Sequence, residues 1–272
     1  MLMRGVVLCI SWLLCLGVAQ AKTVVLIHGF ASGPGTWYKQ GIVQQLVAAG
    51  FAEGGVLPDQ PRSGAIEAKN AVYVVRMPWW KPLQQQAVWL DSLLKRVYTQ
   101  RRQPVILVGH SSGGVVARFY TLWPELRRVP IAALITIAAP NLGTPFANWA
   151  WRALTSPFGR MLDVMDNRSR RLYAARELLW QLQIDVLNPI RWMAFAPHPY
   201  AIQYMSITHA RKWSLVGTGW GIVVPPKYQD LRRVPALGVR ARNVVIPVGH
   251  GLHRWDGAIL QSLLLANLKT GS

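Results

Sequence analysis

Short apolar segments recur along this chain of 272 residues, and stretches with helical periodicity separate them. The apolar segments are nearly continuous, which is typical of strands covered on both faces in a parallel sheet. They are Val24–Ile27, Val72–Val75, Val105–Val108, Ala133–Ile137, Ile202–Ile207 and Val244–Val248. The helical patterns are Tyr38–Ala49, Leu83–Tyr98, Gly113–Trp123 and Ala258–Leu268. This succession predicts an α/β domain with a mostly parallel sheet of about six strands and helices on both faces.

One interval interrupts the succession. Roughly sixty residues separate Ile137 from Ile202, far more than a single crossover needs. Ser169–Leu187 within this interval has helical periodicity, and tryptophan and arginine are frequent in it. We therefore expect a helical insertion over about residues 141–199 that acts as a lid or a substrate wall. Extra helices packed on the core are the alternative.

The first 21 residues have the organisation of a secretory signal peptide. A single positive charge at Arg4 is followed by an apolar run and by small residues up to Ala21. We predict cleavage after Ala21, which leaves a domain of residues 22–272 in a secreted or periplasmic protein. An uncleaved N-terminal membrane anchor is the alternative. Both cysteines lie in this segment, so the mature chain would contain neither a disulfide nor a catalytic thiol.

A GxSxG motif over residues 109–113 joins the predicted strand Val105–Val108 to the predicted helix after it. A strand that turns sharply into a helix crowds its neighbours, and the two glycines leave the necessary room. The serine between them, Ser111, is thereby exposed at the carboxyl edge of the sheet. Ser111 is therefore the candidate nucleophile.

Two more segments reach the same edge of the predicted sheet. An HGF sequence follows the first strand, and the amides of Phe30 and Ser112 would hold the negative oxygen that forms when Ser111 attacks a carbonyl. His250 directly follows the last strand, where its ring can reach the serine hydroxyl and act as general base. His253 is the alternative base.

A carboxylate that orients the base is expected after the strand Ile202–Ile207, but residues 208–226 contain no Asp or Glu. Asp230 is the one carboxylate between that strand and His250, so it is the candidate acid. Three alternatives remain: Asp230 pairs with a neighbouring arginine, the site is a serine and histidine dyad with a polar group or water in the third place, or the insertion supplies a carboxylate.

These segments resemble the α/β-hydrolase superfamily, and within it the secreted bacterial lipases and esterases. The resemblance extends over essentially the whole mature chain and is carried by LIHGF, VGHSSGG, AAPNLGTP and RNVVIPVGHG, which begin at Leu26, Val108, Ala138 and Arg242. A fifth segment, GIVVPP, is similar to a lipase segment that has Asp directly before or at its glycine. This chain has Trp220 and Gly221 at those positions.

The resemblance implies Ser111 as nucleophile, His250 as general base and Phe30 with Ser112 as oxyanion donors. We expect a secreted serine hydrolase that cleaves carboxylic esters of lipidic character through an acyl-enzyme, with no metal and no organic cofactor. One alternative is a thioesterase, amidase or acyltransferase that uses the same site. The other is a catalytically weak scaffold that binds anionic envelope lipids.

The charge of the chain also bears on its partners. Lys and Arg number 30 against 11 Asp and Glu, which gives a net charge of +19. Such a surplus favours anionic partners. The arginines occur in pairs spread along the chain without a nucleic-acid-binding module, so we expect an anionic membrane surface as partner and no nucleic acid.

Overall fold

The computed structural model describes residues 21–59, 61–126, 128–184, 187–210 and 223–266. Nearly all of the predicted signal peptide, residues 1–21, lies outside these ranges and stays a prediction. Within these ranges, no helix is both long enough and apolar enough to cross a bilayer.

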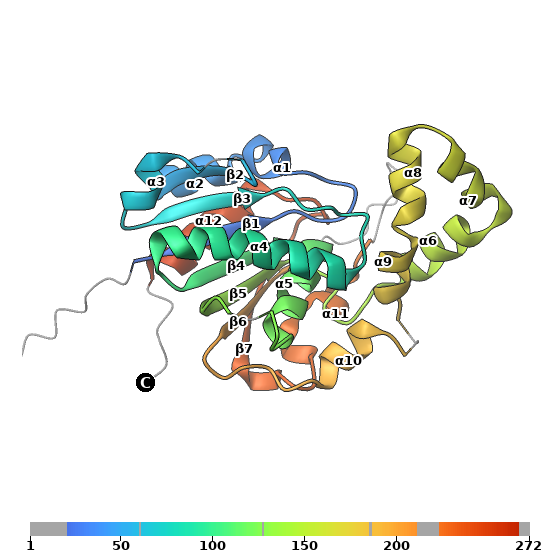
Figure 1. Ribbon diagram of the computed structural model, residues 1–272. Coiled ribbons are helices and arrows are strands. Elements are labelled where there is room, and N and C mark those ends of the chain that lie inside the picture. The colour runs from blue at the N-terminus through green and yellow to red at the C-terminus, as the bar shows by residue number, and fades with distance from the viewer. Residues whose placement is uncertain (1–20, 60, 127, 185–186, 211–222, 267–272) are drawn as a thin grey trace, which may run out of the picture.

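A parallel sheet of seven strands forms the centre of the molecule (Figure 1). The strands are β1 (Thr23–Ile27), β2 (Ala52–Leu57), β3 (Ala71–Val75), β4 (Val105–His110), β5 (Ile131–Ile137), β6 (Gln203–His209) and β7 (Ala241–Ile246). Their order across the sheet is β2-β3-β1-β4-β5-β6-β7, and each neighbouring pair is parallel. The predicted mostly parallel sheet is confirmed, with β2 as an additional strand.

Helices cover both faces of this sheet, as predicted; Figure 1 shows α4 in front of it and α12 behind it. The helices outside the long β5–β6 interval are α1 (Gly35–Lys39), α2 (Ile42–Ala48), α3 (Ser63–Glu67), α4 (Leu83–Arg101), α5 (Ser112–Leu122), α11 (Pro226–Gln229) and α12 (Arg254–Leu265), with 3-10 helices η2 (Leu231–Arg233) and η3 (Gly238–Arg240). The predicted helix Tyr38–Ala49 is divided into α1 and α2 because Gly41 between them has a φ of 69°.

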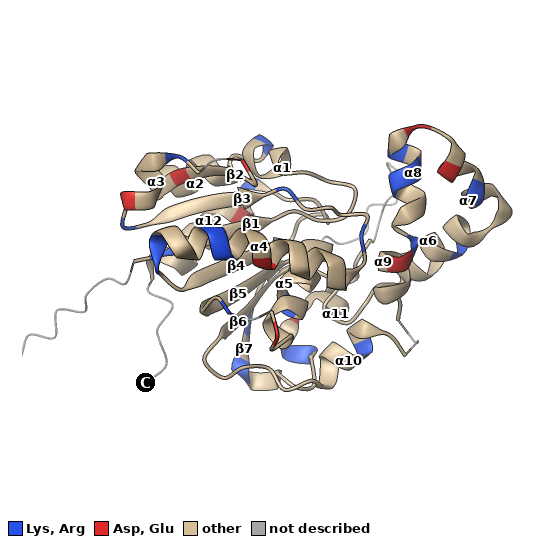
Figure 2. Cartoon of the chain, in the orientation of Figure 1, with Lys and Arg blue, Asp and Glu red and all other residues tan. Residues whose placement is uncertain are grey.

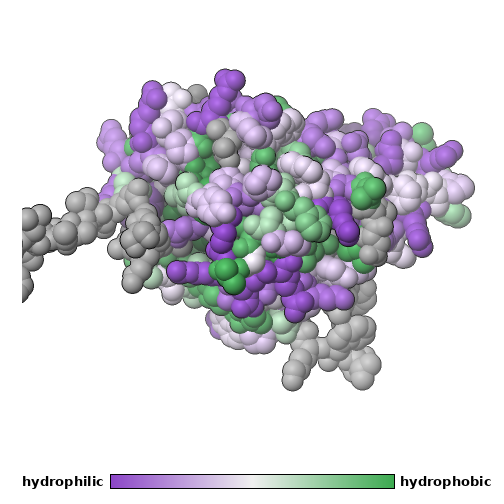
Figure 3. Space-filling model, turned by 90° about the horizontal axis from the view of Figure 1, so that it is seen from below, coloured by the Kyte–Doolittle hydropathy of each residue, from purple (hydrophilic) through white to green (hydrophobic). Residues whose placement is uncertain are grey.

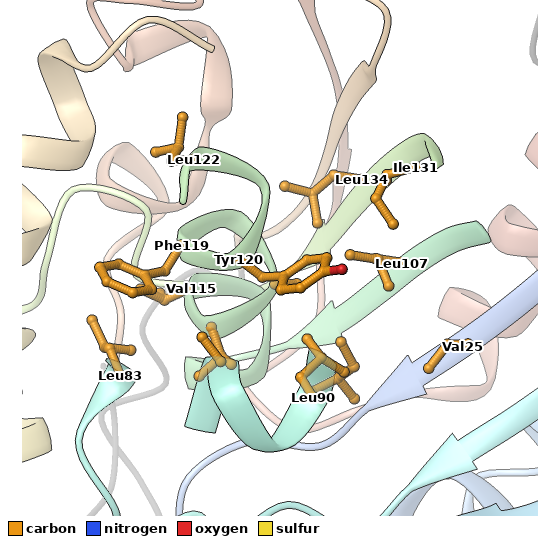
Figure 4. Packing of buried hydrophobic residues seen from close by; sticks show 14 of the residues in the cluster. Val25, Leu83, Leu90, Leu107, Val115, Phe119, Tyr120, Leu122, Ile131 and Leu134 are labelled. Atoms are coloured by element: carbon orange, nitrogen blue, oxygen red, sulfur yellow. The ribbon is translucent and has the colours of Figure 1, made fainter. Parts of the chain in front are cut away.

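The hydrophobic core lies on the two faces of the sheet, and the strand β1 contributes to both. Val25 and Ile27 belong to the cluster under α4 and α5, whereas Val24 and Leu26 belong to the cluster under α2 and α12. Figure 4 shows side chains of the first cluster pointing toward one another from α4, α5 and the strands. Every residue of β1 is buried, which agrees with the continuously apolar sequence of Val24–Ile27.

The strand β2 escaped prediction because its sequence, AEGGVL, is neither continuously apolar nor alternating. The sheet requires these glycines. A Cβ atom at Gly54 would lie 2.2 Å from Cε1 of Tyr73, and Gly55 has a φ of 84°. The pairing of β2 with β3 also shifts register between Glu53 and Gly55. The glycines that make room for the ring of Tyr73 therefore interrupt the apolar pattern that would have predicted β2.

The interval between β5 and β6 forms a group of helices, of which α6, α7 and α8 project beyond the sheet (Figure 1). The group comprises α6 (Pro145–Thr155), α7 (Pro157–Met161), η1 (Leu162–Val164), α8 (Asn167–Ala174), α9 (Arg176–Gln181) and α10 (Pro189–Phe195). The helical region expected over Ser169–Leu187 is thus two short helices that meet at Ala175. Asp166 caps α8 by accepting hydrogen bonds from the amides of Arg168 and Ser169 at 2.7 and 3.1 Å.

Candidate active site

Ser111 lies at the sharp turn between β4 and α5, with φ 53° and ψ −130°. A positive φ is unfavourable for a residue with a side chain, so the surrounding structure must hold this turn in place. The amide of Ser111 donates a hydrogen bond of 2.9 Å to the carbonyl of Ile137, which ties the turn to the end of β5. Ser111 is buried, with 8% of its surface exposed.

Glycines at the predicted positions allow this turn. A Cβ atom at Gly113 would lie 2.4 Å from the carbonyl oxygen of His28, and one at Gly109 would lie 2.4 Å from Cα of Gly114. The loop after β1 is equally close to the nucleophile, because a Cβ at Gly29 would lie 2.7 Å from Cβ of Ser111. Side chains at these positions would push α5 away from β1.

The structure brings Ser111 and His250 together across 139 residues of sequence. Oγ of Ser111 lies 3.0 Å from Nε2 of His250, which stands in the loop between β7 and α12. The hydroxyl can therefore donate its proton directly to the imidazole. His253, the alternative base, instead caps α12 by accepting a hydrogen bond from the amide of Trp255 at 3.2 Å.

The surroundings of His250 favour the neutral imidazole. Burial, together with the nearby His110 and His209, lowers the pKa of His250 to about 3. A neutral ring that accepts the Ser111 proton at Nε2 carries its own hydrogen at Nδ1. This Nδ1 atom is buried and finds no hydrogen-bond acceptor among the described residues.

The structure does not bring Asp230, the predicted acid, to His250. Both carboxylate oxygens of Asp230 accept hydrogen bonds from the guanidinium of Arg232, at 2.8 to 3.2 Å, and Oδ1 also caps η2. Burial alone would raise the pKa of Asp230, but the hydrogen bonds from Arg232 hold it below its ordinary value. Pairing with a neighbouring arginine, the alternative to the acid assignment, is thus the observed arrangement. Of the range expected to hold the acid, residues 211–222 lie outside the described residues.

The two predicted oxyanion donors, Phe30 and Ser112, both lie next to residues that touch or adjoin Ser111. Phe30 follows Gly29 in the loop that touches Ser111, and Ser112 begins α5. In the described part of the chain, neither amide donates to a backbone carbonyl. The ring of Phe30 packs against Trp79 in an edge-to-face contact with 5.2 Å between centroids. Both amides therefore stay the predicted donors to a carbonyl oxygen placed beside Ser111.

Three buried residues at the site carried no role in the sequence interpretation: His110, His209 and Asp256. Nε2 of His110 donates to the carbonyl of His250 at 2.9 Å, and burial above all lowers the pKa of His110 to about 4. Nε2 of His209 lies 2.8 Å from Oδ1 of Asp256, while its Nδ1 lies 2.7 Å from the carbonyl of Gly249. Only their positions in the sequence could have pointed to these residues. His110 and His209 end strands, and Asp256 stands three residues after His253, at capping-box spacing.

A groove with a volume of about 970 Å³ lies between α5, α9 and α10. Its walls are largely aromatic and aliphatic, and they include Phe119, Trp123, Trp180, Trp192 and Phe195. Ser111 and His250 are not among its lining residues. The groove is thus a largely apolar surface that the insertion forms together with α5, and Ser111 and His250 do not line it.

Comparisons with known proteins agree with this architecture. Residues 24–261 match the sequence profile described as the alpha/beta hydrolase family. The product of the gene lin2722 of Listeria innocua is 13% identical, with a TM-score of 0.58 over 92% of this chain and 96% of that one. The RedJ thioesterase from the prodiginine biosynthetic pathway in Streptomyces coelicolor is 13% identical, with a TM-score of 0.52 over 91% and 86%. The propeptide form of the Bacillus licheniformis lipase BlEst2 is 16% identical, with a TM-score of 0.50 over 72% and 37%.

No curated protein matches the sequence significantly. The solved structures, all below 25% identity, share the fold of this chain.

The buried histidines make the stability of this protein depend on pH. Nδ1 of His28 donates to the carbonyl of Gly29 and Nε2 accepts from the amide of Met77, which requires a neutral ring. Burial, partly opposed by the Gly29 hydrogen bond and reinforced by Arg76, lowers the pKa of His28 to about 4. In the unfolded chain the pKa of an imidazole returns to its ordinary value of about 6.5. Between about pH 6.5 and 4 the unfolded chain therefore binds a proton at His28 that the folded chain does not bind. The free energy of unfolding is therefore greatest above about pH 6.5 and falls as the pH decreases toward about 4.

We expect His28→Gln to make this dependence shallower, by up to about 1.4 kcal/mol per pH unit between pH 6.5 and 4. Urea unfolding at a series of pH values measures the slope. As a control, Leu90→Ala removes a buried core side chain and should lower the free energy of unfolding at every pH without changing the slope. Equal slopes for His28→Gln and the wild type would contradict the assignment.

Proposed function

Because the chain belongs to the alpha/beta hydrolase family, we propose that it is a serine hydrolase that cleaves carboxylic esters at Ser111. The observation that carries the proposal is the 3.0 Å contact between Oγ of Ser111 and Nε2 of His250, beside two amides available for an oxyanion. A nucleophile, a base and oxyanion donors within reach of one another are the requirements of acyl transfer.

The reaction follows from this geometry. Oγ of Ser111 attacks the acyl carbon while its proton passes to Nε2 of His250. The carbonyl oxygen becomes negative and is held by the amides of Phe30 and Ser112. When the C–O bond of the ester breaks, the imidazolium of His250 gives its proton to the departing alkoxide, which leaves as the alcohol. Water then attacks the acyl-enzyme, its proton passes to His250 and back to Oγ, and the acid is released.

The substrate class that we propose is a lipidic ester. The oxyanion loop is lined by aromatic rings, since Phe30 contacts Trp79, and Trp79 contacts Trp80 at 5.7 Å between centroids. Arg171 of α8 lies 4.4 Å above the ring of Trp80, so the insertion packs against this aromatic surface. Apolar walls of this kind favour an acyl chain over a polar acyl group.

A thioesterase or an acyltransferase would use the same Ser111 and His250. The reactions differ only in the leaving group or in the acceptor that attacks the acyl-enzyme. Comparing acyl esters with acyl thioesters of equal chain length, and water with added alcohols as acceptor, separates these activities.

We expect Ser111→Ala to lower kcat for p-nitrophenyl acyl esters by roughly a million-fold, because the covalent step is lost. Spectrophotometric assays across several acyl lengths measure the loss. Ser262→Ala is the matched control, since Ser262 is an exposed serine of α12, and it should retain wild-type kcat. Undiminished ester cleavage by Ser111→Ala would rule out the mechanism.

We also propose that the projecting helices α6 to α8 adsorb to an anionic membrane surface. Residues 145–174 contain five Arg and two Asp, a net charge of +3 (five minus two). Figure 2 shows these basic residues on α6, α7 and α8. The same segment exposes large apolar side chains: Phe158 is 84% exposed and Val164 is 82% exposed. In Figure 3 hydrophobic surface lies among hydrophilic residues at this end of the molecule.

Exposed apolar side chains beside arginines fit a lipid surface, because the apolar side chains enter the acyl region and the arginines meet anionic headgroups.

We expect the double variant Phe158→Ser and Val164→Ser to bind phosphatidylglycerol vesicles about tenfold more weakly, a loss of about 1.4 kcal/mol of apolar burial. Co-sedimentation measures the binding. Val239→Ser, at a fully exposed valine of η3, is the control and should bind like the wild type. Equal binding of the wild type to phosphatidylcholine and phosphatidylglycerol vesicles would exclude the proposal.

We propose further that the enzyme is exported, supported by the N-terminal pattern of a positive charge, an apolar run and small residues before Lys22. The N-terminal sequence of the protein recovered from the periplasm or the medium should begin at Lys22. A cell-associated protein that retains its first 21 residues would favour the uncleaved anchor instead.

A further inference from the structure

The loop between β7 and α12 carries His250, and three buried side chains fix its backbone. Nδ1 of His209 donates to the carbonyl of Gly249 at 2.7 Å, and Nε2 of His110 donates to the carbonyl of His250 at 2.9 Å. The carboxylate of Asp256 accepts from the amide three residues earlier at 2.7 Å. The peptide groups on both sides of His250 are thus held by ring nitrogens from the ends of β6 and β4.

The partners of His209 determine its charge. Both ring nitrogens face acceptors, since Nδ1 meets the carbonyl of Gly249 and Nε2 meets Oδ1 of Asp256 at 2.8 Å. A carbonyl cannot donate, so Nδ1 carries a hydrogen, and only the proton between Nε2 and Asp256 can be on either group. Imidazole is the stronger base of the two in water.

The second oxygen of Asp256 further favours the ionised carboxylate. It accepts the amide of His253, and Asp256 is the third residue of α12, where the helix N-terminus stabilises negative charge. The shared proton therefore resides on His209, which is an imidazolium paired with a carboxylate. The side chains of His209 and Asp256 are 1% and 0% exposed. A buried ion pair whose own ring nitrogens and carboxylate oxygens are all hydrogen-bonded is a rigid element.

Gln229 completes the support of this pair. Its side chain accepts from the amide of His209 at 2.7 Å and donates to the carbonyl of His209 at 3.1 Å. The backbone and the ring of His209 are therefore both held by hydrogen bonds, and the ring in turn holds the loop at Gly249 through Nδ1.

We propose that His209, held as an imidazolium by Asp256, is a positioning residue that fixes His250 through the carbonyl of Gly249. In the described residues the ring of His250 has no acceptor at Nδ1, so its orientation depends on its backbone and on Ser111. The His209–Asp256 pair thus contributes orientation that an acid at the Nδ1 atom would otherwise provide. This inference rests on the proposed function of Ser111 and His250.

The charge of His209 can be measured in the wild-type protein without any substrate. Nitrogen-15 NMR of the full chain at pH 7 should show hydrogens on both ring nitrogens of one histidine, and these signals should disappear in His209→Gln. A single ring hydrogen on His209 would overturn the inference.

The positioning role can be measured by the rate at which a fluorophosphonate probe labels Ser111. His209→Gln replaces the imidazolium with a neutral amide, so labelling should slow by roughly 10- to 100-fold, since a misplacement of about 1 Å costs on the order of 100-fold in rate. Asp256→Asn lets a neutral His209 still donate to Gly249, so its labelling rate should lie between those of His209→Gln and the wild type.

His198→Gln is the matched control. His198 is a buried histidine whose Nδ1 donates to the carbonyl of Ala196 at 2.9 Å, and it precedes β6 at the amino end of that strand, away from Ser111. It should lose thermal stability while the labelling rate of the folded protein stays at the wild-type value. Rates are compared at a temperature where all variants are folded by circular dichroism.

The outcomes separate the two proposals. A wild-type protein whose Ser111 is not labelled would overturn the proposed function, and with it the catalytic part of the inference. A labelled wild type together with His209→Gln labelled at the same rate would overturn the positioning role alone. Slower labelling of His209→Gln, with His198→Gln unchanged, is the expected result.

Discussion

The site depends on the close contact between the start of α5 and the loop after β1. A Cβ atom at Gly113 would lie 2.4 Å from the carbonyl oxygen of His28, so only backbone fits between these two segments. The contact places the loop of Phe30 beside Ser111 and leaves the amides that could bind an oxyanion without backbone acceptors in the described chain. The strained turn at Ser111 persists because β5, through the carbonyl of Ile137, holds it from the other side.

Burial around this contact then decides the protonation of the site. The chain as a whole carries a charge of +19, yet His28, His110 and His250 are all neutral when folded because their pKa values are lowered to between about 3 and about 4. The neutral ring of His250 has a nitrogen free of hydrogen, Nε2, that faces the hydroxyl of Ser111. His209 and Asp256 are buried as well, and each is the hydrogen-bond partner of the other.

The sequence predicted some residues of this site and missed others. Ser111 and His250 were predictable because each directly follows a strongly apolar strand, and the carboxyl ends of parallel strands meet at one edge. Asp230 was chosen by elimination along the sequence, but both of its carboxylate oxygens accept hydrogen bonds from Arg232, two residues away. Asp256 belongs to the capping box of α12, a local pattern that gives no sign of a partner on β6.

The sequence by itself determined the sheet, its central strands, the nucleophile turn and the strand end that carries the base, because apolar runs and glycine spacings are local properties. Tertiary structure alone decided that the edge strand β2 exists, since Gly54 makes room for the ring of Tyr73. It alone decided which carboxylate meets which cation, since Asp230 pairs with Arg232 and Asp256 with His209. Such pairings depend on which side chains the packed layers bring within hydrogen-bond distance, and a distance across 47 residues, as for His209 and Asp256, is not encoded in any local pattern.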